Sequence, residues 1–312
     1  MEYTDPTEER EPVDNRPNFG QLPGLVEILF VIFLVIILGW GGSQIAQMIA
    51  RSSGQDLETL LKTLGENNTL GNRNLVRFAN LAVHFMSFTL PCLLLAIFIR
   101  RNKWYEYLSL NVKPEPRILA LASVLIFVAM PFTSLIYWIN MQIPLPEWAT
   151  SLEQGAEEMI NALLTMDSPA ELLFNLLIIA IVPAIGEELL FRGVFQKVLT
   201  RSLRNEHTAI WVTAFLFSMM HMQFEGFFPR FLLGAILGYL FSWSRNLWVP
   251  ITAHLVFNGI QVILKYFAGG LMENMEAGSV DKPPWFLGII SLIFTIALAL
   301  HIKRALKKED TV

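Results

Sequence analysis

Long apolar runs constrain this chain more than any other feature of its sequence. Lipid offers a backbone no hydrogen-bond partners, so a segment that crosses a bilayer closes its own hydrogen bonds as a helix of about 17 to 25 residues. We therefore predict an all-α, polytopic integral membrane protein with about eight transmembrane helices around a buried polar site. The runs lie at roughly 24–48, 76–99, 118–139, 170–186, 207–222, 228–244, 247–267 and 285–302.

Composition agrees with this fold class and excludes one class of partner. Hydrophobic residues make up 54% of the 312 residues and charged residues 16%, against roughly 25% charged in ordinary soluble domains. A formal net charge of −4 is the reverse of the basic surface that nucleic-acid binding requires, so we expect no nucleic acid as a partner. The single cysteine, Cys92, lies in an apolar run and is interpreted as a small buried hydrophobe.

The polar segments divide the chain into one membrane domain and two short ends. Residues 1–23 are acidic and lack the basic stretch that precedes the apolar core of a cleaved signal peptide, so the first run is expected to remain as a helix. We predict a single membrane domain over 24–302, with a motif-bearing core at about 170–267, and a basic tail over 303–312. The segment 147–166 is either an amphipathic interfacial helix or a solvated connector.

The distribution of lysine and arginine predicts the orientation. Short cytoplasmic loops carry an excess of both residues. They are frequent between the second and third runs, after the fourth and after the last, and absent from 140–168. We therefore expect both termini at the cytoplasmic face of the plasma (inner) membrane. Four residues in and near the first loop oppose this orientation: Arg51, Lys62, Arg73 and Arg77.

Two adjacent acids, Glu187 and Glu188, follow the fourth apolar run without an intervening helix breaker. A charge at bilayer depth costs about 2.5 to 3.5 kcal/mol even on the lenient insertion scale, so such residues usually face a bundle interior. Glu188 and Arg192 are four residues apart, in the order that favours an ion pair on a helix, while Glu187 points about 100° away. We expect Glu187 to project into a cavity. The alternative is that both acids sit at a helix end and reach headgroup water.

Two further pairs of polar or aromatic residues repeat the four-residue spacing. Phe217 shares a helical face with His221, and His254 shares one with Asn258. The second pair could instead form a hydrogen bond that only holds helices together. Counted along each run at 1.5 Å per residue, His254 and His221 differ in depth by about 10 Å.

The remaining histidines are interpreted without a functional role. His84 is read as a packing histidine, and His207 and His301 lie at run ends where interface placement explains them.

At these positions the chain resembles the intramembrane protease family of CAAX prenyl endopeptidases and bacteriocin-processing relatives, known as the CPBP or ABI family. The first family motif, two glutamates and an arginine, corresponds to Glu187, Glu188 and Arg192. The second, Phe-x-x-x-His, corresponds to Phe217 and His221, and the third, His-x-x-x-Asn/Asp, to His254 and Asn258. The resemblance spans about 75 residues.

The resemblance implies an endopeptidase that hydrolyses a membrane-associated peptide or protein within the bilayer. Glu187 and His221 would activate a water, and His254 and Asn258 would bind the oxyanion of the tetrahedral intermediate. A carboxylate can accept the proton of a water, and preorganised imidazole and amide donors can stabilise an oxyanion in a dry cavity.

Three other readings stay open. Glu187, His221 and His254 could supply a two-histidine, one-carboxylate zinc site, although the resemblance favours water activation without a metal or other cofactor. The same buried acids and histidines could serve a secondary transporter or proton relay. A non-catalytic immunity or scaffold protein could keep the fold and bind a partner membrane protein.

Overall fold

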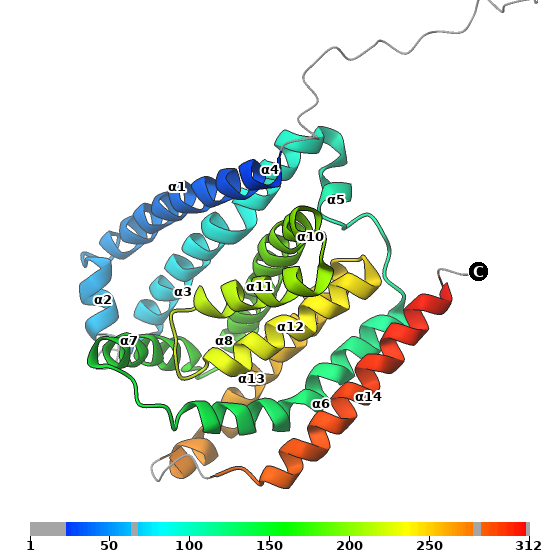
Figure 1. Cartoon of the computed structure of the whole chain (residues 1–312). Coiled ribbons are helices and arrows are strands. Elements are labelled where there is room, and N and C mark those ends of the chain that lie inside the picture. The colour runs from blue at the N-terminus through cyan, green and yellow to red at the C-terminus, as the bar shows by residue number, and fades with distance from the viewer. Residues whose placement is uncertain (1–22, 64–67, 277–281, 310–312) are drawn as a thin grey trace, which may run out of the picture.

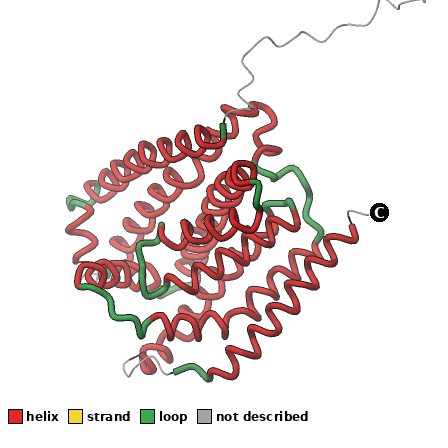
Figure 2. Tube along the Cα trace, viewed as in Figure 1, coloured by secondary structure: helices red, strands yellow, loops and turns green. Residues whose placement is uncertain are grey.

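The computed structural model describes residues 23–63, 68–276 and 282–309. Within these ranges the chain is helical and contains no strand, as Figure 2 shows. The predicted all-α, polytopic fold class is confirmed. The segment 1–22, which is most of the predicted acidic N-terminal segment, lies outside the described residues, as do the last residues of the basic tail, 310–312.

Seven helices are long and apolar enough to cross a membrane among the residues that the structure describes. They are Gly24–Arg51, Leu70–Tyr107, Pro116–Asn140, Pro169–Leu203, Phe227–Ser244, Trp248–Ala268 and Trp285–Lys307. The chain is therefore an integral membrane protein.

The fifth apolar run differs from the expectation of a spanning helix. It forms α11 (Glu206–Met219), which has 14 residues and is about 21 Å long. That length is shorter than the roughly 30 Å hydrocarbon core of a bilayer.

The helices pack side by side, in pairs that are close in the chain and in one pair whose members are far apart in the chain. α1 (Gly24–Arg51) packs on α3 (Leu70–His84), α11 on α12 (Phe227–Ser244), and α14 (Trp285–Glu309) on α6 (Pro116–Asn140) (Figure 1). The remaining long helix, α13 (Trp248–Glu276), contacts α6 and the helix that carries the two glutamates. α14 continues to Glu309, so part of the predicted basic tail extends this helix.

Two of the spanning segments change their helical pitch. The first segment consists of α3, then a π-helical turn at Phe85–Thr89, and then α4 (Leu90–Arg100). A 3₁₀ turn at Arg101–Lys103 and α5 (Trp104–Tyr107) follow it. The second segment contains three α-helical parts, which are α8 (Pro169–Asn175), α9 (Val182–Glu188) and α10 (Lys197–Leu203). One π-helical turn, Leu176–Ile181, joins α8 to α9, and another, Leu189–Gln196, joins α9 to α10. This second segment therefore continues as helix past the two glutamates to Leu203. Such π-helical turns occur frequently at functional sites.

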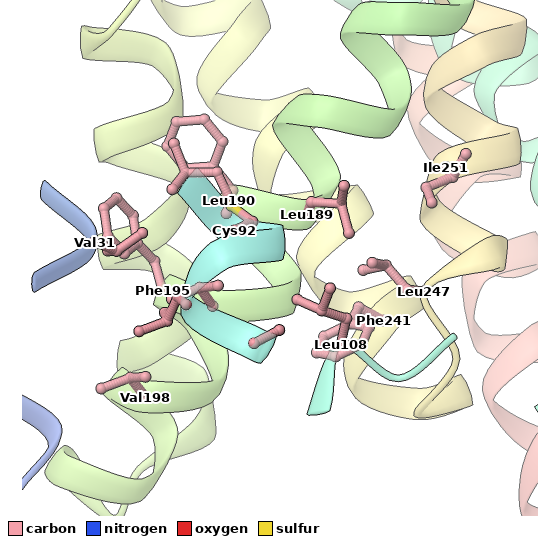
Figure 3. Close-up of a cluster of buried hydrophobic side chains, with 14 of the residues drawn as sticks. Val31, Cys92, Leu108, Leu189, Leu190, Phe195, Val198, Phe241, Leu247 and Ile251 are labelled. Carbon is pink, nitrogen blue, oxygen red and sulfur yellow. The ribbon is translucent and has the colours of Figure 1, made fainter. Parts of the chain in front are cut away.

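The main apolar core packs the second half of this segment against α1, α4 and the start of α13. Its buried members include Val31, Cys92, Leu190, Phe195 and Leu247, several of which Figure 3 labels. Cys92 is fully buried, as its interpretation as a small buried hydrophobe predicts. This core holds in place the segment that directly follows Glu187 and Glu188.

The helix ends gather at two opposite faces of the bundle. We call the end that holds the start of α1, the loops 101–115 and 204–205, and the end of α14 the termini face. We call the other end, which holds α2 (Leu57–Thr63), α7 (Glu147–Leu164) and the C-terminal end of α6, the α7 face. Both described chain ends lie at the termini face (Figure 1).

Segment 147–166 forms an amphipathic helix, α7 (Glu147–Leu164), and is not an irregular connector. Ala162 and Leu163 are buried against the bundle, while Trp148 and Leu152 are 61% and 45% exposed. An exposed apolar stripe beside acidic residues is typical of a helix that lies in the plane of the membrane interface.

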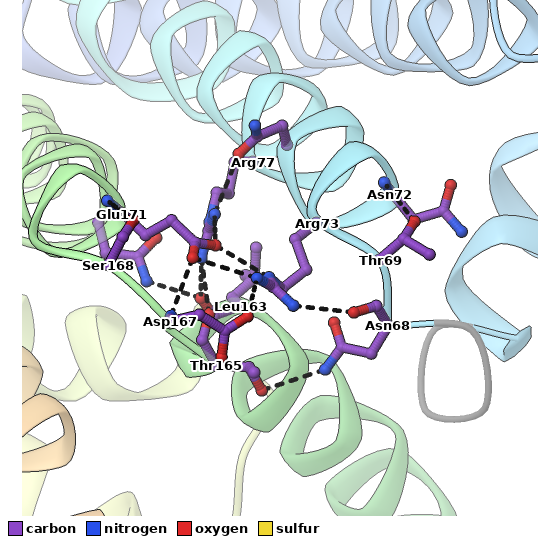
Figure 4. Close-up of polar contacts among 12 residues, drawn as sticks. Asn68, Thr69, Asn72, Arg73, Arg77, Leu163, Thr165, Asp167, Ser168 and Glu171 are labelled. Carbon is purple, nitrogen blue, oxygen red and sulfur yellow. Dashed lines mark hydrogen bonds and ion pairs between the residues drawn. The ribbon is translucent and has the colours of Figure 1, made fainter.

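A buried ionic network ties α3 to α8 at the α7 face (Figure 4). Arg73 donates from Nε to Glu171 at 2.9 Å and from Nη2 to Asp167 at 2.5 Å, and Arg77 donates to Glu171 at 2.7 Å. Arg77 also donates to the carbonyl oxygen of Thr165 at 2.8 Å. Two of the arginines that opposed the predicted orientation are therefore paired inside the bundle and do not belong to a loop.

Replacing Glu171 with glutamine should destabilise the fold, because Arg77 would then lose the carboxylate that faces it inside the bundle. Breaking a buried ion pair typically costs about 3 to 5 kcal/mol. We expect a loss of that size in the free energy of unfolding, measured by denaturant titration in detergent. Glu58→Gln is the matched control, because Glu58 and its partner Lys62 are 77% and 73% exposed, and it should leave the free energy of unfolding nearly unchanged. Equal losses in the two variants would contradict the assignment.

Candidate active site

The predicted site residues come from three separate segments and meet inside the bundle. Glu187 and Glu188 end α9, and Arg192 lies one turn further, within the π-helical turn. His221 lies in the turn after α11, and His254 in the first part of α13. Glu188 and Arg192 have no exposed surface, and Glu187 and His254 are 8% and 3% exposed.

The predicted ion pair between Glu188 and Arg192 is present. Arg192 Nη1 donates to Glu188 Oε1 at 2.6 Å, and its Nη2 donates to the carbonyl oxygen of Gly234 in α12 at 2.7 Å. His254 Nδ1 lies 2.9 Å from the same Glu188 oxygen. Glu188 therefore joins its own helix to α12 through Arg192 and to α13 through His254.

The Glu187 carboxylate faces histidines on both of its oxygens. His84 Nε2 lies 3.3 Å from Oε1. On the other oxygen, Oε2, the Nε2 atoms of His254 and His221 lie at 3.8 Å and 4.0 Å. Oε2 is buried and makes no hydrogen bond within the part of the chain that the structure describes. The two distances leave room for a small oxygen-bearing group between the three side chains.

Hydrogen bonds at the far side of each ring fix how His221 and His254 present Nε2. His221 Nδ1 lies 2.8 Å from the carbonyl oxygen of Phe217, and His254 Nδ1 faces the Glu188 carboxylate. Carbonyl and carboxylate oxygens only accept, so each Nδ1 carries a proton. In the neutral form of either ring, Nε2 then offers a lone pair towards Glu187.

Phe217 packs against most of the polar site. Its ring centroid is 5.1 Å from that of His221 and 5.8 Å from that of His254, and the Arg192 guanidinium carbon lies 4.9 Å above it. Both histidine contacts are edge-on, the arrangement that the ring quadrupole favours. The aromatic residue of the second motif therefore keeps the histidines and the arginine in place.

The structure brings His221 and His254 to the same carboxylate despite the depth difference expected from the sequence. His221 lies two residues past the end of α11, in the turn before α12. Asn140 of α6 holds the following loop there, donating to the carbonyl oxygen of Phe224 at 2.9 Å and accepting from the backbone nitrogen of Phe228 at 2.9 Å. Both histidines thus reach the same carboxylate oxygen.

His84 is the site residue that the sequence interpretation missed. Its reading as a packing histidine is half right, because its ring stacks on Phe88 with centroids 4.5 Å apart, yet Nε2 faces Glu187. The signal in the sequence is Gly186. A Cβ at that position would lie 2.8 Å from Thr89 Oγ1 and 3.0 Å from His84 Cε1, so glycine permits the close approach of the two helices.

Asn258 shares the cavity of the site but makes its polar contact elsewhere. Its Nδ2 donates to the carbonyl oxygen of Ile179 at 3.4 Å. Asn258 lies one turn after His254 on α13 and is partly exposed to the cavity. The structure therefore brings five of the six predicted residues into one contact network and places the sixth on the wall of the adjoining cavity.

A cavity of about 770 Å³ opens beside the Glu187 carboxylate. Its inner end is formed by Glu187, Phe217, His221 and His254, and its walls come from α6, α7, the start of α12 and the middle of α13. A volume of this size accommodates a short stretch of peptide, and a mostly apolar wall with a few polar groups is typical of substrate sites.

The donor set at Glu187 also suits zinc in chemical type. Two imidazole nitrogens whose Nδ1–H groups are held by a carbonyl and a carboxylate resemble the outer-shell pattern of zinc-binding histidines. Ligands of one tetrahedral zinc, at about 2.0 to 2.1 Å from the metal, lie about 3.4 Å apart, whereas the separations here are 3.8 and 4.0 Å. In the described part of the chain, no three histidine, cysteine, aspartate or glutamate side chains are close enough to bind one metal ion together. The residues would hold zinc after an adjustment of about half an ångström.

Comparison with known proteins bears on this same part of the chain. Residues 169–260 match the family model of Rce1-like type II CAAX prenyl endopeptidases. An uncharacterized protein of Bacillus subtilis (strain 168), YpbD, is 27% identical over 90 residues, which cover 28% of this chain and 43% of the Bacillus protein. No solved structure matches this chain significantly. The resemblance predicted from the three motifs is therefore confirmed: the part of the chain that carries Glu187, His221 and His254 matches the Rce1-like CAAX prenyl endopeptidase family.

Proposed function

We propose that this chain is an intramembrane endopeptidase that hydrolyses a peptide bond in a membrane-associated peptide or protein. One observation carries the proposal: a buried carboxylate oxygen, Glu187 Oε2, lies at the end of a cavity, without a hydrogen bond in the described structure and facing two imidazole nitrogens. The match to the endopeptidase family model at the same residues supports it.

In the proposed mechanism a water occupies the space between Glu187 Oε2 and His221 Nε2. Glu187 accepts a proton as the water attacks the scissile carbonyl, and later returns it to the leaving amine. The neutral His221 accepts the second hydrogen bond of the water through Nε2 and aims its oxygen. General-base help of this kind typically accelerates hydrolysis by about 10² to 10⁴.

The oxyanion of the tetrahedral intermediate would be stabilised by His254 and Asn258. His254 already donates from Nδ1 to Glu188, so it can donate from Nε2 only when both ring nitrogens are protonated. The carboxylates of Glu187 and Glu188 lie on either side of this ring, 3.8 Å from Nε2 and 2.9 Å from Nδ1. Asn258 can turn its amide from Ile179 into the cavity, where a fixed donor is worth about 3 kcal/mol of barrier.

We favour water activation by Glu187 without a metal. If zinc were bound, Glu187, His221 and His254 would hold it, and the ion would polarise the scissile carbonyl and acidify a water. Metal analysis of active, purified protein separates the two mechanisms. Activity that persists in a chelator with far less than one zinc per chain supports the proposal, whereas activity lost to the chelator and restored by zinc supports the metal site.

We further propose that both termini lie at the cytoplasmic face of the plasma membrane. The termini face carries most of the loop lysines and arginines, whereas the loop 140–168 at the α7 face carries none. Arg73 and Arg77 belong to helix α3 and are paired internally. The positive-charge rule concerns loop residues, so Arg51, Lys62 and Lys282 still oppose the orientation but are fewer than the basic residues of the termini face.

Glu187→Gln and His221→Ala should each lower the rate of cleavage by about 10² to 10⁴, because each removes a group that activates the water. The measurement is reconstitution of the purified enzyme with host membrane proteins and identification of new peptide termini by mass spectrometry. Lys113→Ala is the control, because Lys113 is exposed at the termini face and has no role in the site. Full cleavage by both site variants would refute the mechanism, and retained biological activity of Glu187→Gln would indicate a non-catalytic scaffold.

Glu188→Gln should lower stability as well as activity, because it breaks the contacts to Arg192 and His254 together. Losing one partner of a buried ion pair costs about 3 to 5 kcal/mol. Glu187→Gln keeps the shape of the side chain and should unfold within about 1 kcal/mol of the parent protein. Denaturant titration in detergent of both variants tests the difference, and equal destabilisation would contradict the division of labour between the two glutamates.

A further inference from the structure

The cavity beside Glu187 extends towards one face of the bundle only. Its outer walls are formed by Tyr137 near the end of α6, Met159 and Leu164 of α7, Gln261 in the second half of α13, and Pro283 just before α14. All of these positions belong to the half of the bundle that ends at the α7 face. The inner end stops at Glu187 and His254, beyond which the main apolar core fills the bundle towards the termini face.

The hairpin of α11 and α12 forms one wall of this opening. Both helices have their other ends at the termini face, where Arg245 pairs with Glu206 at 2.9 Å. Their connecting loop contacts α7, where Glu153 accepts a hydrogen bond from the backbone nitrogen of Phe224 at 2.7 Å. Pro229 and Arg230, just after this loop, line the cavity.

The two faces also differ in charge. The rim near the cavity carries acidic residues on α7 and on the hairpin loop. Partial burial, together with the carboxylates of Glu153 and Glu157, raises the pKa of Glu225. The loop between α6 and α8 contains no lysine or arginine, whereas the termini face is rich in both. By the positive-charge rule, the face onto which the cavity opens is the extracytoplasmic one.

We propose that the active site takes its substrate from the extracytoplasmic side of the membrane. The substrate class is then a peptide segment anchored in the membrane, or lying on it, whose scissile bond is exposed on the outer side. This inference rests on the proposed function for the cleavage itself, but the direction of the opening rests on the cavity and the charge distribution alone.

Cysteine labelling tests the direction without requiring catalysis. Cys92 is fully buried and gives little background. Ser134→Cys places a thiol on the exposed cavity wall and Met159→Cys places one at the mouth, whereas Lys113→Cys places one in the loop at the termini face. Intact cells are treated with a membrane-impermeant maleimide, before or after permeabilisation.

We expect Met159→Cys and Ser134→Cys to be labelled in intact cells and Lys113→Cys only after permeabilisation. The proposal would be overturned if Lys113→Cys were the one variant labelled in intact cells. It would also be overturned if Ser134→Cys were labelled neither before nor after permeabilisation. In the active enzyme, labelling Ser134→Cys from outside should also block cleavage. Labelling as expected in a protein that cleaves nothing would refute the proposed function and leave the direction of the opening intact.

A second inference concerns His84, which the proposed mechanism does not use. His84 contacts Glu187 from the side opposite the cavity and does not line it. It reaches the oxygen Oε1, while Oε2 faces His221 and His254. The ring is held by its stack on Phe88, and Gly186 leaves room for it.

We infer that His84 is a positioning residue for Glu187. By donating Nε2–H to Oε1, it fixes the rotation of the carboxylate so that Oε2 is aimed at the attacking water. This role requires a donor at that position, and it does not require His84 to touch the substrate.

The test compares His84→Ala with His84→Gln. Misplacing a catalytic group by about an ångström can cost on the order of 100-fold in rate, so we expect kcat to fall by about ten- to a hundredfold in His84→Ala with KM unchanged. His84→Gln keeps an N–H donor and should recover a large part of kcat. A loss in kcat at unchanged KM that the N–H donor of His84→Gln restores is a result that a merely structural role would not give. Full kcat in His84→Ala, or equal loss in both variants at equal stability, would overturn the assignment.

Discussion

The buried contact between Glu188 and Arg192 is the interaction on which the site depends. Two charges with no exposed surface carry a desolvation cost of several kcal/mol each, which only close pairing and further hydrogen bonds can offset. Here Arg192 also binds the carbonyl oxygen of Gly234, and Glu188 also binds His254. The same contacts that neutralise the charges therefore fix α9, α12 and α13 relative to one another. The position of His254 in the active site follows from a structural ion pair.

Gly234 shows how closely this arrangement is packed. A Cβ there would lie 3.1 Å from the Ala214 Cα and 3.2 Å from the Phe217 ring. The absence of a side chain lets α11 and α12 approach each other, which brings Phe217 under the guanidinium of Arg192 and edge-on to both histidines. Ion pair, aromatic ring and imidazoles thus form one unit, which explains why a phenylalanine accompanies the histidine in the second motif.

Local spacing in the sequence predicted those parts of the site that lie within a single helix. The ion pair between Glu188 and Arg192 depends on a separation of four residues, and a helix brings such residues together whatever surrounds it. His84 could not be found in this way, because it is 103 residues from Glu187 and meets it only through helix packing. Its neighbours in the chain are apolar, which is why it was interpreted as a packing histidine. Its functional contact, Glu187, belongs to another helix.

The length of α11 marks a second limit of prediction from hydropathy. The run 207–222 is apolar enough for a membrane helix, but hydropathy does not determine where a helix stops relative to its neighbours. Asn140 and Glu153 provide hydrogen-bond partners for the backbone of the loop that follows, so protein side chains satisfy its irregular backbone. These contacts, which come from other segments of the chain, fix where the hairpin turns.

The turn after α11 has a chemical consequence for Glu187. It presents Nε2 of His221 to the oxygen of Glu187 that His84 leaves free. The carboxylate is therefore held from one side by a helix that packs tightly through Gly186, and on the other side it meets the cavity. The hydrogen bonds that hold the loop after His221 thus contribute to the geometry of the site.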